Sequence, residues 1–191
     1  IGRFNEAWVE AYRGRTSADV LADLRAVIGE RREALAGMGQ DAFDEESFTP
    51  AGRDTYGRFM RIRVMDMWFH DQDIRQAVDR AGDLGGPAAA TALDEVSVGL
   101  GYVVGKKAAA PQGASVRFEL TGPMARRIDL AVADRARVVD GLPGEPTATL
   151  TVPGDHFMRL VGGRGADPTA VAVEGDDALG RAVVANLAFV I

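Results

Sequence analysis

Residues 61–75 read RIRVMDMWFHDQDIR and lie in a segment, 55–78, that has one glycine and no proline. Such a segment predicts one helix about 35 Å long, at 1.5 Å per residue. Asp66 and His70 are four residues apart, so both side chains fall on one face of this helix, about 6 Å apart along its axis. Asp73 follows three residues later and continues the same polar stripe.

A carboxylate and an imidazole at this spacing favour a metal site. A rigid helix fixes two ligands, and another element then supplies a third. Asp73 is predicted to orient His70 by accepting its second ring proton. The alternative is an ordinary surface ion pair between Asp66 and His70 on a solvated seam. The spacing leaves both interpretations open.

Four other residues in the stretch favour structural roles. Asp71 and Arg75 are four residues apart and predict an ordinary ion pair on the helix surface. Adjacent aromatic residues such as Trp68 and Phe69 pack in cores more often than they stack on a cofactor.

Composition narrows the class of protein. The 191 residues are 47% hydrophobic and 26% charged, enough for one large domain or two small ones. The net charge of −6 argues against a nucleic-acid surface, and no apolar run reaches membrane-spanning length. The chain has no cysteine, which excludes disulfides and Cys-based zinc clusters and weakly favours the cytoplasm. Any thiol chemistry must therefore use an external thiol.

The segments around the long helix differ in their periodicity. Thr16 is predicted to cap a helix that ends at Gly37. An acidic surface linker is expected over residues 41–52. Pro87 is predicted to begin another helix, which extends to about residue 104. Small residues at 108–113 predict a domain boundary. The remainder predicts an antiparallel sheet covered by helices on one side, with strands at 115–120, 128–132, 148–152 and 171–173 and helices from Asp155 and Asp176.

Three segments resemble the mycothiol-dependent maleylpyruvate isomerase family: MDMWFHDQDIR at 65–75, VRFELTGP at 116–123 and VEGD at 173–176. The resemblance implies an α+β protein in two parts. Residues 1–107 are expected to be a DinB-like four-helix bundle that binds a divalent metal, with zinc the expected ion. Residues 113–191 are expected to be a small α+β domain like sterol carrier protein. Members use the low-molecular-weight thiol mycothiol.

The family pattern also implies a ligand set. Its metal takes one histidine from an early helix, then a carboxylate and a histidine four residues apart on a later helix, which map onto Asp66 and His70. The carboxylate is Asp66 where the pattern has Glu. The other histidine of the chain, His156, falls in the second domain, where a surface or capping role is expected. The chain opens at Ile1 rather than Met, so we expect the early histidine to precede it.

The predicted function is a metal-dependent enzyme that uses mycothiol to isomerise, or to transfer sulfur to, a small electrophilic substrate. Asp73 would support His70, while Arg75 and Arg164 would meet acidic groups of the substrate. Arg164 lies among three glycines, so a solvated loop is the alternative for it. Two other functions stay open: a module that binds an apolar small molecule or lipid, and a non-catalytic protein with a vestigial metal site. The expected partners are a small thiol and its electrophile, without nucleic acid or membrane, and a homodimer is left open.

Overall fold

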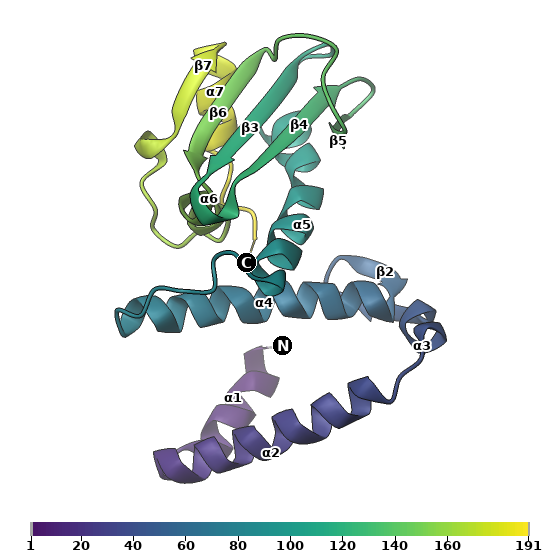
Figure 1. Cartoon of the computed structure of the whole chain (residues 1–191), viewed down its shortest axis with the longest axis vertical. Coiled ribbons are helices and arrows are strands. Elements are labelled where there is room, and N and C mark those ends of the chain that lie inside the picture. Colours follow the sequence, from purple (N-terminus) through teal and green to yellow (C-terminus); the bar gives the residue numbers. More distant parts are fainter. Residues whose placement is uncertain (1, 191) are drawn as a thin grey trace.

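Helix α4 (Tyr56–Ala77) is the predicted long helix, and it crosses the molecule between the N-terminal helices and the sheet (Figure 1). The computed structural model describes residues 2–190, apart from the side chains of Gly2 and Phe4. Thr55 caps the helix, because its hydroxyl accepts a hydrogen bond from the backbone N–H of Arg58 at 3.1 Å.

The N-terminal part of the described chain contains the helices α1 (Gly2–Tyr12) and α2 (Ser17–Ala36). Thr16 caps α2 as predicted, accepting a hydrogen bond from the backbone N–H of Asp19. No residue of α2 is buried, and its apolar positions stay exposed in this structure. The buried side chains of the helical region therefore come from α4 and the helix that follows it.

The prediction of a linker without secondary structure over residues 41–52 is wrong. This segment forms a short helix, α3 (Gln40–Asp44), and a hairpin of β1 (Glu46–Thr49) and β2 (Gly52–Thr55). The hydroxyl of Thr49 closes its turn by donating to the carbonyl of Gly52 at 2.8 Å, and Gly52 adopts a φ of 111°. Strands of four mostly polar residues carry little alternation, which is why the sequence did not reveal them.

Helix α5 (Pro87–Tyr102) begins at the predicted proline and continues as a π-helical turn (Val103–Lys107). It packs along α4 and also against the sheet. Its residues Leu93, Val96 and Leu100 belong to one hydrophobic core that also contains Trp68 and Phe69 of α4 and the inner face of the sheet. The domain division at residues 107 and 113 stays a prediction, but α5 belongs physically to the core of the sheet.

The sheet contains β3 (Ser115–Thr121), β4 (Arg126–Val132), β5 (Ala136–Val139), β6 (Ala148–Pro153) and β7 (Ala172–Gly175) in the order β5-β4-β3-β6-β7. Neighbouring strands are antiparallel except β3 and β6, which run parallel. The α+β fold is therefore confirmed, with a parallel pair at the centre. Strand β5 was not predicted; three of its four residues lie at least partly in solvent at the sheet edge, so burial imposes little pattern on them.

Helices α6 (Gly154–Val161) and α7 (Asp177–Val184) lie behind the sheet in Figure 1. Alternate residues of β3 point toward them, so that Phe118 meets Phe157 of α6 edge to face, with ring centroids 5.5 Å apart. Helix α7 ends at Val184, although Leu187 beyond it is still buried. No described helix is long and apolar enough to cross a membrane.

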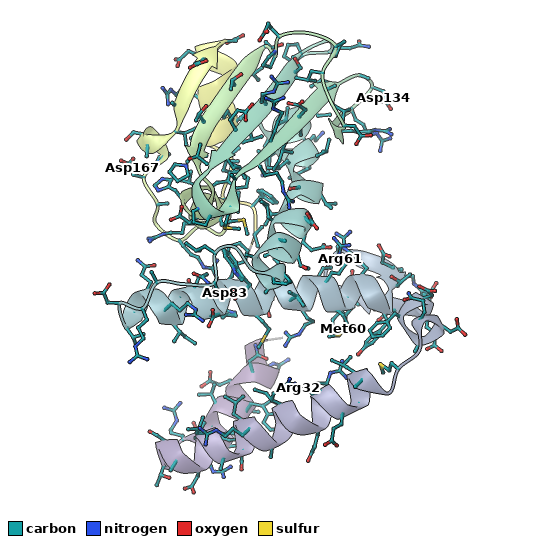
Figure 2. All side chains as sticks on the ribbon, in the orientation of Figure 1. Arg32, Met60, Arg61, Asp83, Asp134 and Asp167 are labelled. Atoms are coloured by element: carbon teal, nitrogen blue, oxygen red, sulfur yellow. The ribbon has the colours of Figure 1, made fainter. Side chains whose placement is uncertain are left out.

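A buried carboxylate joins α4 to α5. The side chain of Glu95 on α5 is only 2% exposed, and its two oxygens lie 2.9 Å from Nε of Arg58 and 2.8 Å from Nε of Arg61. Figure 2 shows Arg61 on α4 beside the base of α5. A buried carboxylate is tolerated only when it is paired, so this cluster constrains how the two helices approach each other.

We predict that Glu95→Ala lowers the free energy of unfolding by about 3 kcal/mol, because it removes the buried carboxylate that pairs with both Arg58 and Arg61. Urea unfolding followed by circular dichroism measures the change. The matched control is Glu46→Ala, which removes an ion pair with Arg53 whose carboxylate is 72% exposed, and a change within about 0.5 kcal/mol is expected. Equal losses in both variants would contradict a special role for Glu95.

Candidate functional site

His70 lies on α4 between two carboxylates. Its Nε2 is 3.5 Å from Oδ1 of Asp66, and its Nδ1 is 3.6 Å from Oδ2 of Asp73. The predicted stripe therefore exists, and one aspartate faces each ring nitrogen. The imidazole is 65% exposed and both carboxylates are 40% exposed, so solvent reaches the stripe in this structure.

The Asp66 and His70 pair has the geometry of two ligands of one metal ion. Two ligand atoms bound to a tetrahedral zinc at 2.0–2.1 Å are separated by about 3.3 Å, close to the 3.5 Å between Oδ1 and Nε2. The second oxygen of Asp66 accepts a hydrogen bond from Arg63 at 3.0 Å, which holds the carboxylate in place. Residues 2–190 contain no group of three side chains able to hold a metal, so the pair fits a metal but does not complete its ligand set.

Asp73 is held from the other side by Arg164. The guanidinium donates through Nε to Oδ1 at 2.7 Å and through Nη2 to Oδ2 at 3.0 Å, a bidentate pair between residues 91 positions apart. These hydrogen bonds, with the positive charge of the guanidinium behind them, hold the pKa of the Asp73 carboxyl below its usual value. Asp73 is thus ionised and engaged on both sides of its carboxylate.

The loop that follows α6 brings Arg164 to this position. Its Nη1 donates to the carbonyl of Gly162 at 2.9 Å, and its guanidinium carbon lies 4.5 Å from the ring centroid of Phe69. Gly163 and Gly165 both adopt positive φ angles, 63° and 64°, which let the loop turn tightly. Arg164 therefore makes specific contacts with α4, and the solvated-loop alternative does not describe it.

Arg75 is also engaged. Its Nε donates to Oδ2 of Asp71 at 2.6 Å, which confirms the predicted ion pair, and Asp71 raises the pKa of the guanidinium. Trp68 and Phe69, predicted to pack, are buried, and the indole N–H of Trp68 donates to the carbonyl of Asp83 at 3.1 Å. Whether Arg75 meets a substrate stays a prediction.

A cavity of about 240 Å³ opens beside Asp73. It lies between the C-terminal half of α4, the loop of residues 79–84 and helix α6. Its wall combines apolar side chains with charged ones from both halves of the chain, namely Trp68, Phe69, Leu84 and Met158 together with Asp73, Arg75, Asp79, Arg80, Asp155, Arg159 and Arg164. A mixed pocket of this kind suits a small polar molecule with an acidic group.

Arg80 and Arg159 are cavity residues that the sequence did not single out. Neither makes an ion pair with another described residue. Arg159 donates through Nη2 to the carbonyl of Arg164 at 3.2 Å, while its Nε is buried without a hydrogen-bond partner. A buried donor without a partner is costly. No local motif marks Arg159, because only the packing of α6 against α4 makes it part of a cavity.

His156 lies outside this cavity. Its Nε2 is 2.8 Å from the carbonyl oxygen of Asp167, a contact that ties α6 to the loop before β7. Asp167 in turn accepts hydrogen bonds from both the hydroxyl and the backbone N–H of Thr169. The contact agrees with the predicted surface role of His156.

Two sequence-family models match the chain. The mycothiol maleylpyruvate isomerase N-terminal domain matches residues 1–75, and the C-terminal domain of the same family matches residues 90–182. The chain belongs to this family. Membership supports a mycothiol-dependent, isomerase-like function. Most of α5 falls within the C-terminal match, which agrees with its packing against the sheet.

Comparisons with other proteins add little beyond the family. No curated protein matches the chain. Among solved structures, a UbiJ-SCP2 ubiquinone synthesis protein is 14% identical with a TM-score of 0.35, over 52% of this chain and 98% of that one. Sterol carrier protein 2 from Yarrowia lipolytica in its apo form is 16% identical with a TM-score of 0.36, over 52% of this chain and 90% of that one.

We predict that Asp73→Asn destabilises the protein at neutral pH by at most about 1 kcal/mol, since the ion pair is partly exposed and screened. The lowered pKa of Asp73 sets the sign: its stabilisation is complete above the unfolded pKa of about 4 and is lost as pH falls through the lower pKa of the folded state. The difference between variant and wild type should therefore shrink below pH 4. Urea unfolding at pH 6 and pH 3 measures it.

The control for this pH dependence is Asp134→Asn. Asp134 is labelled in Figure 2 and forms only exposed ion pairs with Arg135 and Arg137. Little change in stability is expected from it at either pH. An Asp73→Asn loss that is the same at pH 6 and pH 3 would contradict the assignment of the ionised Asp73 carboxylate as the stabilising partner of Arg164.

Proposed function

We propose that this protein is a metal-dependent enzyme that uses mycothiol as an external thiol to isomerise, or to transfer sulfur to, a small electrophilic acid. The family supports the thiol and the isomerase-like chemistry. The metal, the acidic substrate and the roles of individual residues are our proposal.

One observation carries it: Asp73 belongs to both parts of the candidate site. Its Oδ2 faces Nδ1 of His70, whose Nε2 faces Asp66, and the same side chain lines the cavity that contains Arg80 and Arg159. A thiol activated at the Asp66 and His70 pair would therefore lie next to a molecule bound in the cavity. Placing a nucleophile and an electrophile side by side is the main requirement of such a reaction.

The chain supplies binding and orientation. Asp66 and His70 would hold a divalent cation, with a third ligand from outside the described residues. Asp73 would accept a hydrogen bond from Nδ1–H of His70 and so keep Nε2 available as a ligand. When bound, the cation would supply Lewis acidity that lowers the pKa of a coordinated thiol.

The cavity would bind the electrophilic substrate. The guanidinium groups of Arg80 and Arg159, which form no ion pair within the described residues, would bind the acidic group of the electrophile, while Trp68 and Phe69 give its carbon skeleton an apolar wall. The sulfur of the external thiol would add to an unsaturated carbon of the electrophile. If the carbon–sulfur bond then breaks again, the double bond can re-form in the other geometry, which is isomerisation; if the bond is kept, the thiol has been transferred to the electrophile through its sulfur. The chain has no cysteine to compete for this role.

The apolar-ligand alternative has less support. The space between the sheet and its helices is filled by side chains, with Phe118, Leu150, Phe157 and Val183 fully buried in it. A ligand there would have to displace packed core residues, which costs free energy.

We predict that the protein binds about one zinc ion per chain and that His70→Ala abolishes both zinc binding and mycothiol-dependent turnover, since only Asp66 of the proposed pair of ligands would remain. Zinc is measured by atomic emission after purification without chelators. The matched control is His156→Ala, which should keep both. Less than about half an equivalent of zinc in wild type, or turnover that survives in His70→Ala, would overturn the metal-dependent function.

We predict that Arg159→Gln weakens the binding of a small dicarboxylate about tenfold, because it removes a charged donor that lines the cavity. Fumarate serves as the probe and uncharged fumaramide as its control. Quenching of Trp68 fluorescence reports binding, in a Trp8→Phe background so that the signal comes from the cavity wall alone. Equal binding of fumarate and fumaramide, or no effect of Arg159→Gln, would show that the cavity does not select an acid.

A further inference from the structure

Arg164 connects the sheet domain to the polar stripe of α4. Within residues 2–190, its pair with Asp73 is the one ion pair that joins α4 to any residue beyond 113. Its side chain is 22% exposed, compared with 40% for Asp73, so the guanidinium is the better-buried partner. The contact thus reaches from the C-terminal half of the chain into the candidate metal site.

The two hydrogen bonds from Arg164, which together we call the fork, fix the plane of the Asp73 carboxylate. Both oxygens accept hydrogen bonds from one rigid planar group, and that group is itself held by the carbonyl of Gly162 and the ring of Phe69. An aspartate that is 40% exposed would otherwise be free to change rotamer in solvent. Because of Arg164, the oxygen that faces His70 has a defined position.

Oδ2 of Asp73 is the oxygen that faces Nδ1 of His70, at 3.6 Å. With Nδ1 toward Asp73, the opposite nitrogen, Nε2, points at Asp66 at 3.5 Å, the arrangement that a shared metal ion needs. If Asp73 moved away, nothing else among the described contacts of His70 would hold Nδ1 on that side. The order of dependence is therefore Arg164, then Asp73, then His70.

We propose that Arg164 is a positioning residue: it acts on the metal site through Asp73 and lets the sheet domain set the orientation of His70. This differs from a role in which Arg164 binds the substrate directly, because both of its carboxylate-binding edges are already used within the protein. The inference rests on the proposed function for its metal, but the ring orientation itself can be tested without one.

The first experiment measures the side-chain nitrogen chemical shifts of histidine in the metal-free protein. The chain has only His70 and His156, so the two rings are easily assigned. Arg164→Lys keeps the charge but loses the fork and the flat contact with Phe69. In Arg164→Lys, the nitrogen chemical shifts of His70 are expected to move toward those of a histidine whose ring has no fixed orientation. The nitrogen chemical shifts of His156 are expected to stay unchanged.

The matched control is Arg117→Lys. Arg117 makes the same bidentate contact with Asp129 in the sheet, at 2.7 and 3.1 Å, and within residues 2–190 it forms no hydrogen bond or ion pair with α4. It should therefore change stability without moving the His70 signals. His70 signals that are identical in Arg164→Lys and wild type, or that move equally in Arg117→Lys, would overturn the positioning role.

The second experiment is a double-mutant cycle on zinc affinity, measured by competition with a chelator. Asp73→Asn should weaken zinc binding about 10-fold to 100-fold, as loss of a direct partner of a ligating histidine does, and Arg164→Lys about threefold to tenfold. If Arg164 acts only through Asp73, the double variant binds zinc no more weakly than Asp73→Asn alone. Additive losses would overturn the proposal.

The two experiments separate two failures. If wild type binds no zinc, the proposed metal-dependent function fails, and the nitrogen shifts alone decide whether Arg164 positions His70. If zinc binds and the His70 signals do not respond to Arg164→Lys, the function stands and the positioning role fails.

Discussion

Burial of Trp68 and Phe69 fixes the rotation of α4 about its own axis, and the candidate site depends on that rotation. The two aromatic side chains insert into the core shared by α5 and the sheet. Since successive helical residues turn by about 100°, Asp66, His70 and Asp73 must then lie to one side of this anchor, partly in solvent. A different anchor would bury the polar stripe or turn it away from Arg164.

Ionic contacts then set how α4 meets its neighbours. Glu95, between two arginines, ties the N-terminal half of α4 to α5, while Arg164 ties the C-terminal half to the loop after α6. The first cluster is buried and contributes mainly to stability; the second is partly open and borders a cavity. One helix therefore serves as structural support at one end and as the wall of a candidate active site at the other.

The site as described is divided between the two family domains. Asp66, His70 and Asp73 come from the N-terminal match, and Arg159 and Arg164 from the C-terminal match. A cysteine-free chain that belongs to a mycothiol-using family needs a place where an external thiol and its electrophile can meet, and the junction of α4 with α6 offers one. In the proposed function, the sheet domain would supply Arg159 and Arg164 to a site whose other residues lie on α4.

The sequence by itself determined the local features. The sequence predicted helix α4, the stripe of Asp66, His70 and Asp73, and the pair of Asp71 with Arg75 from 3.6-residue periodicity and nearest-neighbour spacing. Residues 65–75 and two later segments of the sequence also indicated the family. These features depend on residues a few positions apart, so they are visible without the fold.

Tertiary structure alone decided the rest. The hairpin before α4 and the edge strand β5 have too few buried residues to impose alternation on the sequence, and the parallel pairing of β3 with β6 depends on contacts over long separations. The pairing of Asp73 with Arg164 spans 91 positions, and the cavity around Arg159 exists only once α6 packs beside α4. Spacing along a chain fixes which side chains share a helix face, whereas the partner across that face is chosen by packing.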